Sequence, residues 1–156
     1  MIDRKMYVIL HDIRSAHNVG SIFRTADGAG VSKIFLTGYT PAPVDRFGRR
    51  VAEIDKTSLG ATETVLWESC TDIKKLIDDL KKEGVSIVAV EQTPTAIDYR
   101  EKRLWGDGAY IFGNETEGIK EEVWQKADHV LHIPMHGVKE SLNVSTAAGI
   151  ILFSAL

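Results

Sequence analysis

The feature that most constrains the fold of this chain is a regular alternation of short apolar runs with helix-like patterns. The runs are continuous and rich in β-branched or aromatic residues, as buried parallel strands are. Five of them lie at residues 7–10, 33–36, 85–90, 109–112 and 129–133, and a weaker one lies at 63–67. This alternation predicts an α/β domain with a mostly parallel sheet and helices on both of its faces.

Between the runs, apolar residues recur at helical spacing over residues 19–26 and 73–80. Each repeat gives one apolar stripe, which predicts an amphipathic helix packed on the sheet. We expect Asn18 to cap the first helix and Thr71 to cap the second, with Gly84 just past the second helix's end.

The last helical pattern, at residues 144–155, is apolar on nearly all sides. Such a helix must be buried in the core or against another subunit. The chain has 156 residues, enough for about one domain. In a domain of this size we expect the last helix to form a homodimer interface.

Charge and cysteine content exclude several classes of protein. The 19 basic and 22 acidic residues give a net charge of −3, which argues against general coating of nucleic acid but allows a local basic patch. Cys70 is the one cysteine, so no intrachain disulfide can form, and we expect a reduced, cytoplasmic setting. No apolar stretch approaches the roughly 18 residues of a membrane span, and we expect no membrane partner.

Ligands of a parallel sheet bind outside the carboxyl ends of its strands, so the segments that follow the runs are the candidate site. After the first run, the segment HDIRSAHN leads into a helix that carries Asn18 and Arg24. On its own, Asn18 is explained by a simple N-cap of this helix. Arg24 lies beside the apolar stripe, where an arginine needs an anionic partner or ligand.

The segment 37–50 follows the second run and joins three arginines to Tyr39 and Phe47. Basic residues interleaved with aromatic rings suit single-stranded nucleic acid, because phosphates meet the arginines and bases stack on the rings. A solvated surface loop explains the same residues equally well.

The later strand ends are polar as well. Two glycines bracket residues 113–118, where the backbone can approach a ligand closely and present Glu115; a simple β-turn is the alternative. Ser141, Asn143 and Ser145 precede or begin the last helix. Three capping residue types exceed what one helix start requires, which indicates a polar site.

Other chemistries have weaker support. The G-x-G-x-x-G and phosphate-binding loop motifs are missing, and so is the G-x-S-x-G motif of a serine hydrolase. A metal site could be formed by His129, His132 and His136. However, residues three apart on a strand point to opposite faces, and no matching ligands accompany these histidines. We therefore expect no bound metal. A doubly wound nucleotide-binding enzyme, stabilised by NAD or ATP, stays open.

Three of these segments, in order, resemble the motifs of the SpoU/TrmH family of RNA ribose 2′-O-methyltransferases, within the SPOUT superfamily. They are residues 18–26 (NVGSIFRTA), 112–118 (FGNETEG), and 133–137 with 141–145 (IPMHG and SLNVS). The match covers about residues 10–153. The resemblance implies a homodimer and one domain over residues 1–156 whose C-terminal segment forms a trefoil knot, a feature too rare for periodicity to predict.

The resemblance also implies S-adenosylmethionine as the cofactor, bound in the knot largely by backbone groups. The corresponding positions here are Thr93, Gly113, Ile133 and Leu142, with Gly118 shaping the loop. Because the sulfonium is already an activated methyl donor, the enzyme must mainly align a ribose 2′-oxygen for in-line attack.

The family assigns activation of that hydroxyl to the residue that matches Arg24. An arginine with a pKa above about 12 is a poor base, so we expect Arg24 to hold the adjacent phosphate and to stabilise developing alkoxide charge. The residues expected to orient Arg24, the ribose and the cofactor loop are Asn18, Glu115, Ser141 and Asn143.

Family members often carry an extra RNA-binding domain or terminal helical extensions, whereas this sequence runs from the first strand to the last helix. We therefore expect no separate RNA-binding domain and RNA capture through Arg14, Arg46, Arg49, Arg50 and Lys139. The expected substrate is tRNA, with rRNA as the alternative. The competing function is a non-catalytic RNA-binding module that kept the fold.

Overall fold

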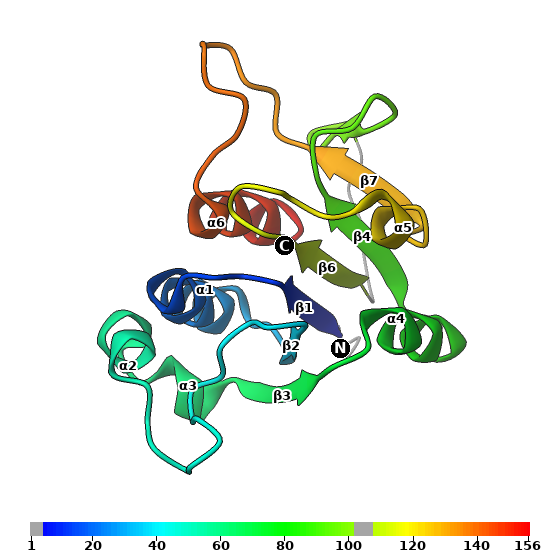
Figure 1. Cartoon of the computed structure of the whole chain (residues 1–156). Coiled ribbons are helices and arrows are strands. Elements are labelled where there is room, and N and C mark those ends of the chain that lie inside the picture. The colour runs from blue at the N-terminus through cyan, green and yellow to red at the C-terminus, as the bar shows by residue number, and fades with distance from the viewer. Residues whose placement is uncertain (1–4, 102–107) are drawn as a thin grey trace.

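The computed structural model describes residues 5–101 and 108–156. Within these residues, seven strands form one fully parallel sheet in the order β3-β2-β1-β6-β4-β7-β5 (Figure 1). The strands are β1 Met6–His11, β2 Lys33–Thr37, β3 Leu66–Cys70, β4 Ser86–Val90, β5 Ile97–Asp98, β6 Gly108–Phe112 and β7 His129–His132.

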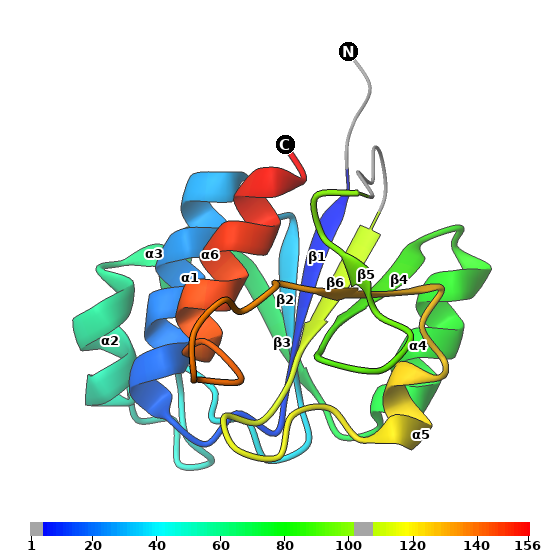
Figure 2. The same cartoon turned by 90° about the horizontal axis from the view of Figure 1, so that it is seen from above.

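Helices cover both faces of the sheet (Figure 2). The helices α1, α2, α3 and α6 lie on one face, and α4 and α5 lie on the other. Their bounds are α1 Ala16–Ala29, α2 Ala52–Ser58, α3 Ala61–Thr64, α4 Ile73–Lys82, α5 Glu121–Trp124 and α6 Val144–Ser154. None of the described helices is long and apolar enough to span a bilayer.

The central strands are buried on both faces, because successive side chains of a strand point to opposite sides. In β1, Val8 and Leu10 pack with α1 and α6, whereas Ile9 packs with α4. The strand β6 divides in the same way, with Phe112 on the first side and Ile111 on the second. Continuous apolar runs therefore mark strands that have a helix layer on each side.

The predicted α/β class, the parallel sheet and the helices on both faces are confirmed, and the five strong runs all form strands. The weak run at 63–67 is placed wrongly, since Glu63 lies in α3 and the strand starts at Leu66. The strand β5 and the helices α3 and α5 were not predicted, because two to four residues carry no readable period.

Two predicted caps are also wrong. Ser15, not Asn18, caps α1, and its side chain accepts a hydrogen bond from the backbone N–H of Asn18. Asp72, not Thr71, caps α4 and accepts from the backbone N–H of Lys75. Asn18 lies inside α1, which frees its side chain for contacts outside the helix.

Candidate functional site

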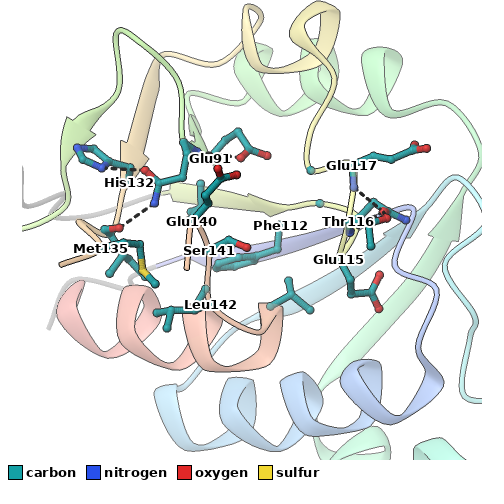
Figure 3. Close-up of a pocket in the computed structure, with 18 residues that line it drawn as sticks. Glu91, Phe112, Glu115, Thr116, Glu117, His132, Met135, Glu140, Ser141 and Leu142 are labelled. Carbon is teal, nitrogen blue, oxygen red and sulfur yellow. Dashed lines mark hydrogen bonds between the residues drawn. The ribbon is translucent and has the colours of Figure 1, made fainter. Parts of the chain in front are cut away.

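The loops that follow β4, β6 and β7 enclose a pocket with the start of α6 (Figure 3). The pocket lies at the carboxyl edge of the sheet, where ligands of parallel sheets bind. Its volume is about 300 Å³, at the lower end of the range of small-molecule sites. It is lined by Val90, Glu91, Gln92, Phe112, Gly113, Asn114, Glu115, Thr116, Glu117, Gly118, His132, Ile133, Met135, Glu140, Ser141, Leu142, Val144 and Ala147.

Glu91 and Gln92 tie these loops together. The Glu91 carboxylate accepts a hydrogen bond from the backbone N–H of Ile119 at 2.7 Å, which links the end of β4 to the loop after β6. The Gln92 amide donates to the carbonyl oxygen of Ile133 at 2.8 Å, which links the same segment to the end of β7. The walls of the pocket are therefore held by hydrogen bonds between segments distant in sequence.

The turn at Gly118 depends on the absence of a side chain. Gly118 has a φ of 68°, in the left-handed region that glycine adopts without strain. A Cβ at this position would also collide with the carboxylate of Glu91. The predicted role of Gly118 in shaping the loop therefore has a physical basis, because only glycine admits both the turn and the Glu91 contact.

A second network joins the pocket to the starts of two helices. The Glu115 carboxylate accepts hydrogen bonds from the backbone N–H groups of Arg14 and Ser15 at 3.0 and 2.9 Å, and from the Asn18 amide at 3.1 Å. The Asn18 oxygen in turn accepts from the amide of Asn143, the cap of α6, at 3.2 Å. Glu115, Asn18 and Asn143 thus form one chain of hydrogen bonds across 125 residues of sequence.

This network sets the charge of Glu115. Burial raises the pKa of a carboxyl group, but the hydrogen bonds from Arg14, Ser15 and Asn18 outweigh it and hold the pKa of Glu115 below its usual value. A negative charge is also favoured here because the carboxylate lies at the N-terminus of α1. Glu115 is therefore ionised at neutral pH.

The structure brings most of the predicted site residues together. Gly113, Gly118, Ile133 and Leu142 line the pocket, and Glu115 and Ser141 line it too. Thr93 does not line the pocket, although it follows directly on Gln92. Asn18 and Asn143 lie outside the lining and connect to it through Glu115.

Arg24 is placed differently from the other predicted catalytic residues. It is exposed on α1, is not among the lining residues, and forms no hydrogen bond or ion pair with the described residues. No side chain among the described residues is an anionic partner for Arg24, so the anionic ligand that the sequence also allowed for this arginine stays a prediction. Because the Arg24 side chain is exposed, a ligand or a second chain can reach it.

The predicted RNA-binding residues are all exposed, but they differ in their partners. Arg46 and Arg49 both lie over the exposed ring of Phe47, with 4.8 and 4.9 Å from guanidinium carbon to ring centroid. Arg49 also pairs with Asp45 at 3.2 Å, and Arg50 pairs with Asp55 and Glu63, each at 2.8 Å.

Arg14 and Lys139 lie on two other loops. Arg14 is exposed in the loop between β1 and α1, next to Glu115. Lys139 is exposed in the loop between β7 and α6. The five predicted residues therefore come from three loops.

Several lining residues were not among the predicted set, chiefly Glu91, Gln92, Met135 and Glu140. Glu91 had a usable signal, because it is the first residue after a buried strand. Glu140 had none, since an acidic residue in a polar loop is typical of surface. Among the described residues, no three His, Cys, Asp or Glu side chains are grouped as metal ligands.

A family model described as the SpoU rRNA Methylase family matches residues 5–153. The chain belongs to this family. The resemblance drawn from the three sequence motifs is thereby confirmed.

Relatives of this SpoU-family chain include the 23S rRNA (guanosine-2′-O-)-methyltransferase RlmB of Vibrio vulnificus, which is 33% identical over 97% of the chain and 58% of its own length. An AdoMet-bound rRNA methyltransferase from Sinorhizobium meliloti superposes with a TM-score of 0.86 at 31% identity, over 97% of this chain and 55% of the other. A TrmH/SpoU tRNA modifying enzyme from A. aeolicus gives 0.85 at 27% identity, over 99% and 75%. The chain spans less than two thirds of the length of the curated relatives it matches.

Proposed function

We propose that this chain transfers the methyl group of S-adenosylmethionine to a ribose 2′-hydroxyl of RNA. The observation that carries the proposal is the pocket itself, in which a glycine-bracketed turn, the end of β7 and the start of α6 converge. These three segments hold the second and third motifs of the SpoU family.

The lining fits this cofactor in charge and in hydrogen bonding. Glu91, Glu117 and Glu140 line the pocket, and carboxylates attract a ligand that carries both a sulfonium and an ammonium group. The Thr93 hydroxyl is buried and has no hydrogen-bond partner among the described residues. Because buried polar groups are nearly always paired, the unpaired Thr93 hydroxyl marks an unusual polar position one residue beyond the lining residue Gln92. We keep Thr93 in the proposed cofactor site, where binding through its backbone is expected.

When bound, S-adenosylmethionine supplies an activated methyl group. The protein's contribution is to hold the ribose hydroxyl in line with that group, which accounts for about 7–11 kcal/mol of a barrier in well-aligned reactions. In our proposal Arg24 binds the adjacent phosphate and stabilises the alkoxide as the hydroxyl loses its proton. Glu115, Asn18 and Asn143 fix the starts of α1 and α6, and Ser141 faces the pocket.

The position of Arg24 leads to a second part of the proposal, a homodimer in which Arg24 serves the pocket of the other subunit. Arg24 lies on α1, which packs beside α6 (Figure 2). Phe153 of α6 is 51% exposed and Leu156 is 47% exposed, and such apolar surface is typical of subunit contacts. A homodimer through α6 would then explain both the interface expected from the sequence and the catalytic role of Arg24.

The trefoil knot of the family remains part of the proposed architecture.

We propose rRNA as the substrate in place of the tRNA expected from the sequence. The Vibrio vulnificus relative is named as a 23S rRNA methyltransferase, and the Sinorhizobium meliloti structure as an rRNA methyltransferase. The A. aeolicus structure is named as a tRNA modifying enzyme, so tRNA is the outcome that would correct this choice. The exposed cluster of Phe47 with Arg46 and Arg49 supplies a surface for the RNA strand.

The deciding experiment is methyl transfer to bacterial total RNA with tritiated S-adenosylmethionine. We expect label in 23S rRNA, and nuclease digestion followed by mass spectrometry will locate a 2′-O-methyl nucleotide. Label confined to tRNA would change the substrate but not the reaction. Cofactor and RNA binding without any transfer would favour the non-catalytic module.

A further inference from the structure

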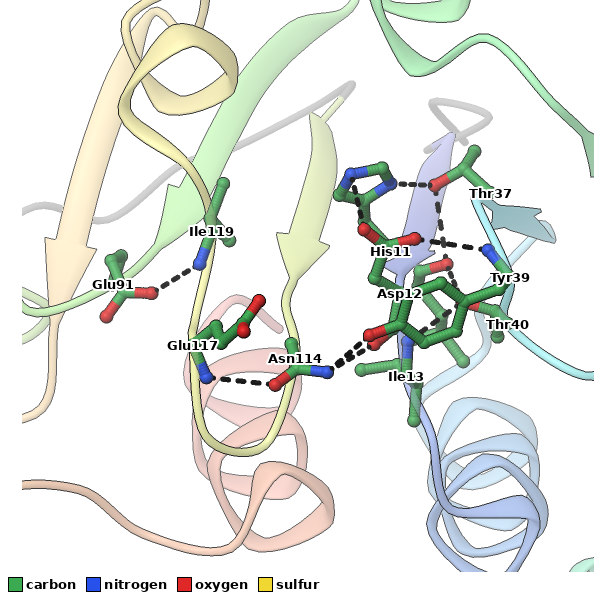
Figure 4. A network of polar contacts seen from close by, with 11 residues as sticks. His11, Asp12, Ile13, Thr37, Tyr39, Thr40, Glu91, Asn114, Glu117 and Ile119 are labelled. Carbon is green, nitrogen blue, oxygen red and sulfur yellow. Dashed lines mark hydrogen bonds and ion pairs between the residues drawn. The ribbon is translucent and has the colours of Figure 1, made fainter.

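Tyr39 lies next to the pocket and is not explained by the function proposed above. It follows β2 in a loop on the edge of the site, and its side chain is 58% exposed. Its hydroxyl nevertheless meets a buried residue of the pocket wall, since the amide nitrogen of Asn114 lies 2.7 Å from Tyr39 Oη (Figure 4). Asn114 is only 7% exposed, so this hydrogen bond connects the exposed ring of Tyr39 to a buried residue of the pocket wall.

The hydrogen bonds around Asn114 fix the direction of this contact. The same amide nitrogen donates to the backbone carbonyl of Asp12 at 2.9 Å, and a carbonyl oxygen can only accept. The Asn114 oxygen accepts from the backbone N–H groups of Thr116 and Glu117, each at 2.9 Å. Asn114 is therefore the donor to Tyr39, and the Tyr39 hydroxyl keeps its own proton available for another acceptor.

The backbone of Tyr39 is held as firmly as its hydroxyl. Its N–H donates to Asp12 Oδ1 at 3.1 Å. Asp12 and the neighbouring Gly38 both have positive φ, 54° and 60°, and a Cβ on Gly38 would collide with the Asp12 carboxylate. An aromatic ring anchored at both ends and still exposed loses little entropy on binding, which suits it to recognition.

We propose that Tyr39 contacts the RNA substrate, with its ring stacking on a nucleobase and its hydroxyl donating to a ribose or phosphate oxygen beside the pocket. The inference rests on the proposed function for the identity of the ligand. RNA fits both features of the residue, because a base offers a flat face to an exposed ring. The sugar and phosphate offer the acceptors that a free O–H donor needs.

The first test measures methyl transfer and RNA binding for two variants. Tyr39→Phe removes the hydroxyl and keeps the ring, whereas Tyr39→Ala removes both. With in vitro transcribed 23S rRNA as the probe, we expect Tyr39→Ala to raise the KM for RNA about ten-fold or more, and Tyr39→Phe to raise it a few-fold. Leu66→Ala is the matched control, because Leu66 is 70% exposed on the edge strand β3.

The affinity for S-adenosylhomocysteine, measured by calorimetry, separates an RNA contact from a structural role. We expect it to stay at the wild-type value in both variants. An affinity that falls in step with activity would mean that Tyr39 only supports Asn114 and the pocket. Wild-type KM values in both variants would also overturn the inference.

A direct contact is tested by crosslinking, which does not depend on turnover. Tyr39→p-azidophenylalanine should crosslink to the 23S rRNA transcript under ultraviolet light, and Leu66→p-azidophenylalanine should not. Tyr39-dependent binding without methyl transfer in the wild type would refute the proposed function but keep the RNA contact. If the Tyr39 variants transfer methyl groups as the wild type does and no crosslink forms at position 39, the RNA contact of Tyr39 is refuted and the proposed function stands.

Discussion

Glu115 accepts hydrogen bonds from two backbone N–H groups that precede α1 and from a side chain within it. A glutamine keeps the shape of the side chain but offers one acceptor oxygen and no charge. We expect Glu115→Gln to lower the free energy of unfolding by about 1 kcal/mol at neutral pH, after allowance for partial exposure of the group. Urea unfolding followed by circular dichroism measures the difference.

The pH dependence of that difference has a definite sign. The pKa of Glu115 is lowered in the folded protein, so its contribution is complete above the unfolded-state value, roughly 4.3, and is lost as the pH falls through the folded-state pKa. The stability gap between wild type and Glu115→Gln should therefore close under acid conditions. Glu117→Gln is the control, and an equal gap at every pH would contradict the argument.

Arg24 has a central role in the proposed reaction, although no contact within the described residues fixes its side chain. Because its side chain has no partner among the described residues, Arg24→Ala should leave stability and affinity for S-adenosylhomocysteine unchanged. Loss of a donor to developing negative charge costs about 10²–10³-fold in rate, and we expect that loss in methyl transfer. Arg100→Ala, which removes an exposed arginine paired with Asp98, should not slow the reaction. Full activity of Arg24→Ala would remove this residue from the mechanism.

At the scale of elements, the loop between β2 and α2 separates arginines with different partners. Arg50 is held by Asp55 and Glu63, whereas Arg46 lies over Phe47 and forms no ion pair with the described residues. We expect Arg46→Ala to weaken RNA binding more than Arg50→Ala and to reduce the salt dependence of binding by about one charge. Fluorescence anisotropy of a labelled rRNA fragment over a salt series tests this, and equal effects of the two variants would count against it.

The sequence predicted those elements that have a long or strongly apolar pattern. The strands β1, β4 and β6 are buried on both faces, so their sequences are continuous apolar runs. The edge strand β3 is mostly exposed, and its weak signal led to a placement about three residues too early. Asn18 looked like a cap because its residue type suits that position, but the contact that decides its role is Glu115, 97 residues away.

The candidate site likewise has a part that the sequence predicted and a part that it did not. Residues such as Gly118 and Glu115 were predicted because they stand at strand ends and match family motifs. The hydrogen bonds from Asn114 to Tyr39 and Asp12 were not predicted, because they join loops that are distant in sequence. Local patterns contain no information on which loop a given side chain will meet.

At the scale of the whole molecule, the single chain presents an incomplete arrangement for the proposed reaction. The pocket lies at the ends of β4, β6 and β7, whereas Arg24 is exposed on α1 and lies outside the lining. In the proposed homodimer, a symmetric interface through α6 would bring each Arg24 to the pocket of the other subunit, because a two-fold interface makes every contact twice. This arrangement predicts that active sites are assembled from two chains.

Complementation between two inactive variants tests the shared site. One chain carries Arg24→Ala, and the other carries Gly118→Val, which strains the positive φ of this turn and collides with Glu91. Co-expression with two different affinity tags yields heterodimers in which the first chain's pocket meets the second chain's Arg24. If the site is shared, tandem purification should recover active heterodimers, and an unpurified mixture should show about one quarter of wild-type activity. If Arg24 served its own subunit, no heterodimer would hold a complete site, and the purified heterodimers would be as inactive as either parent.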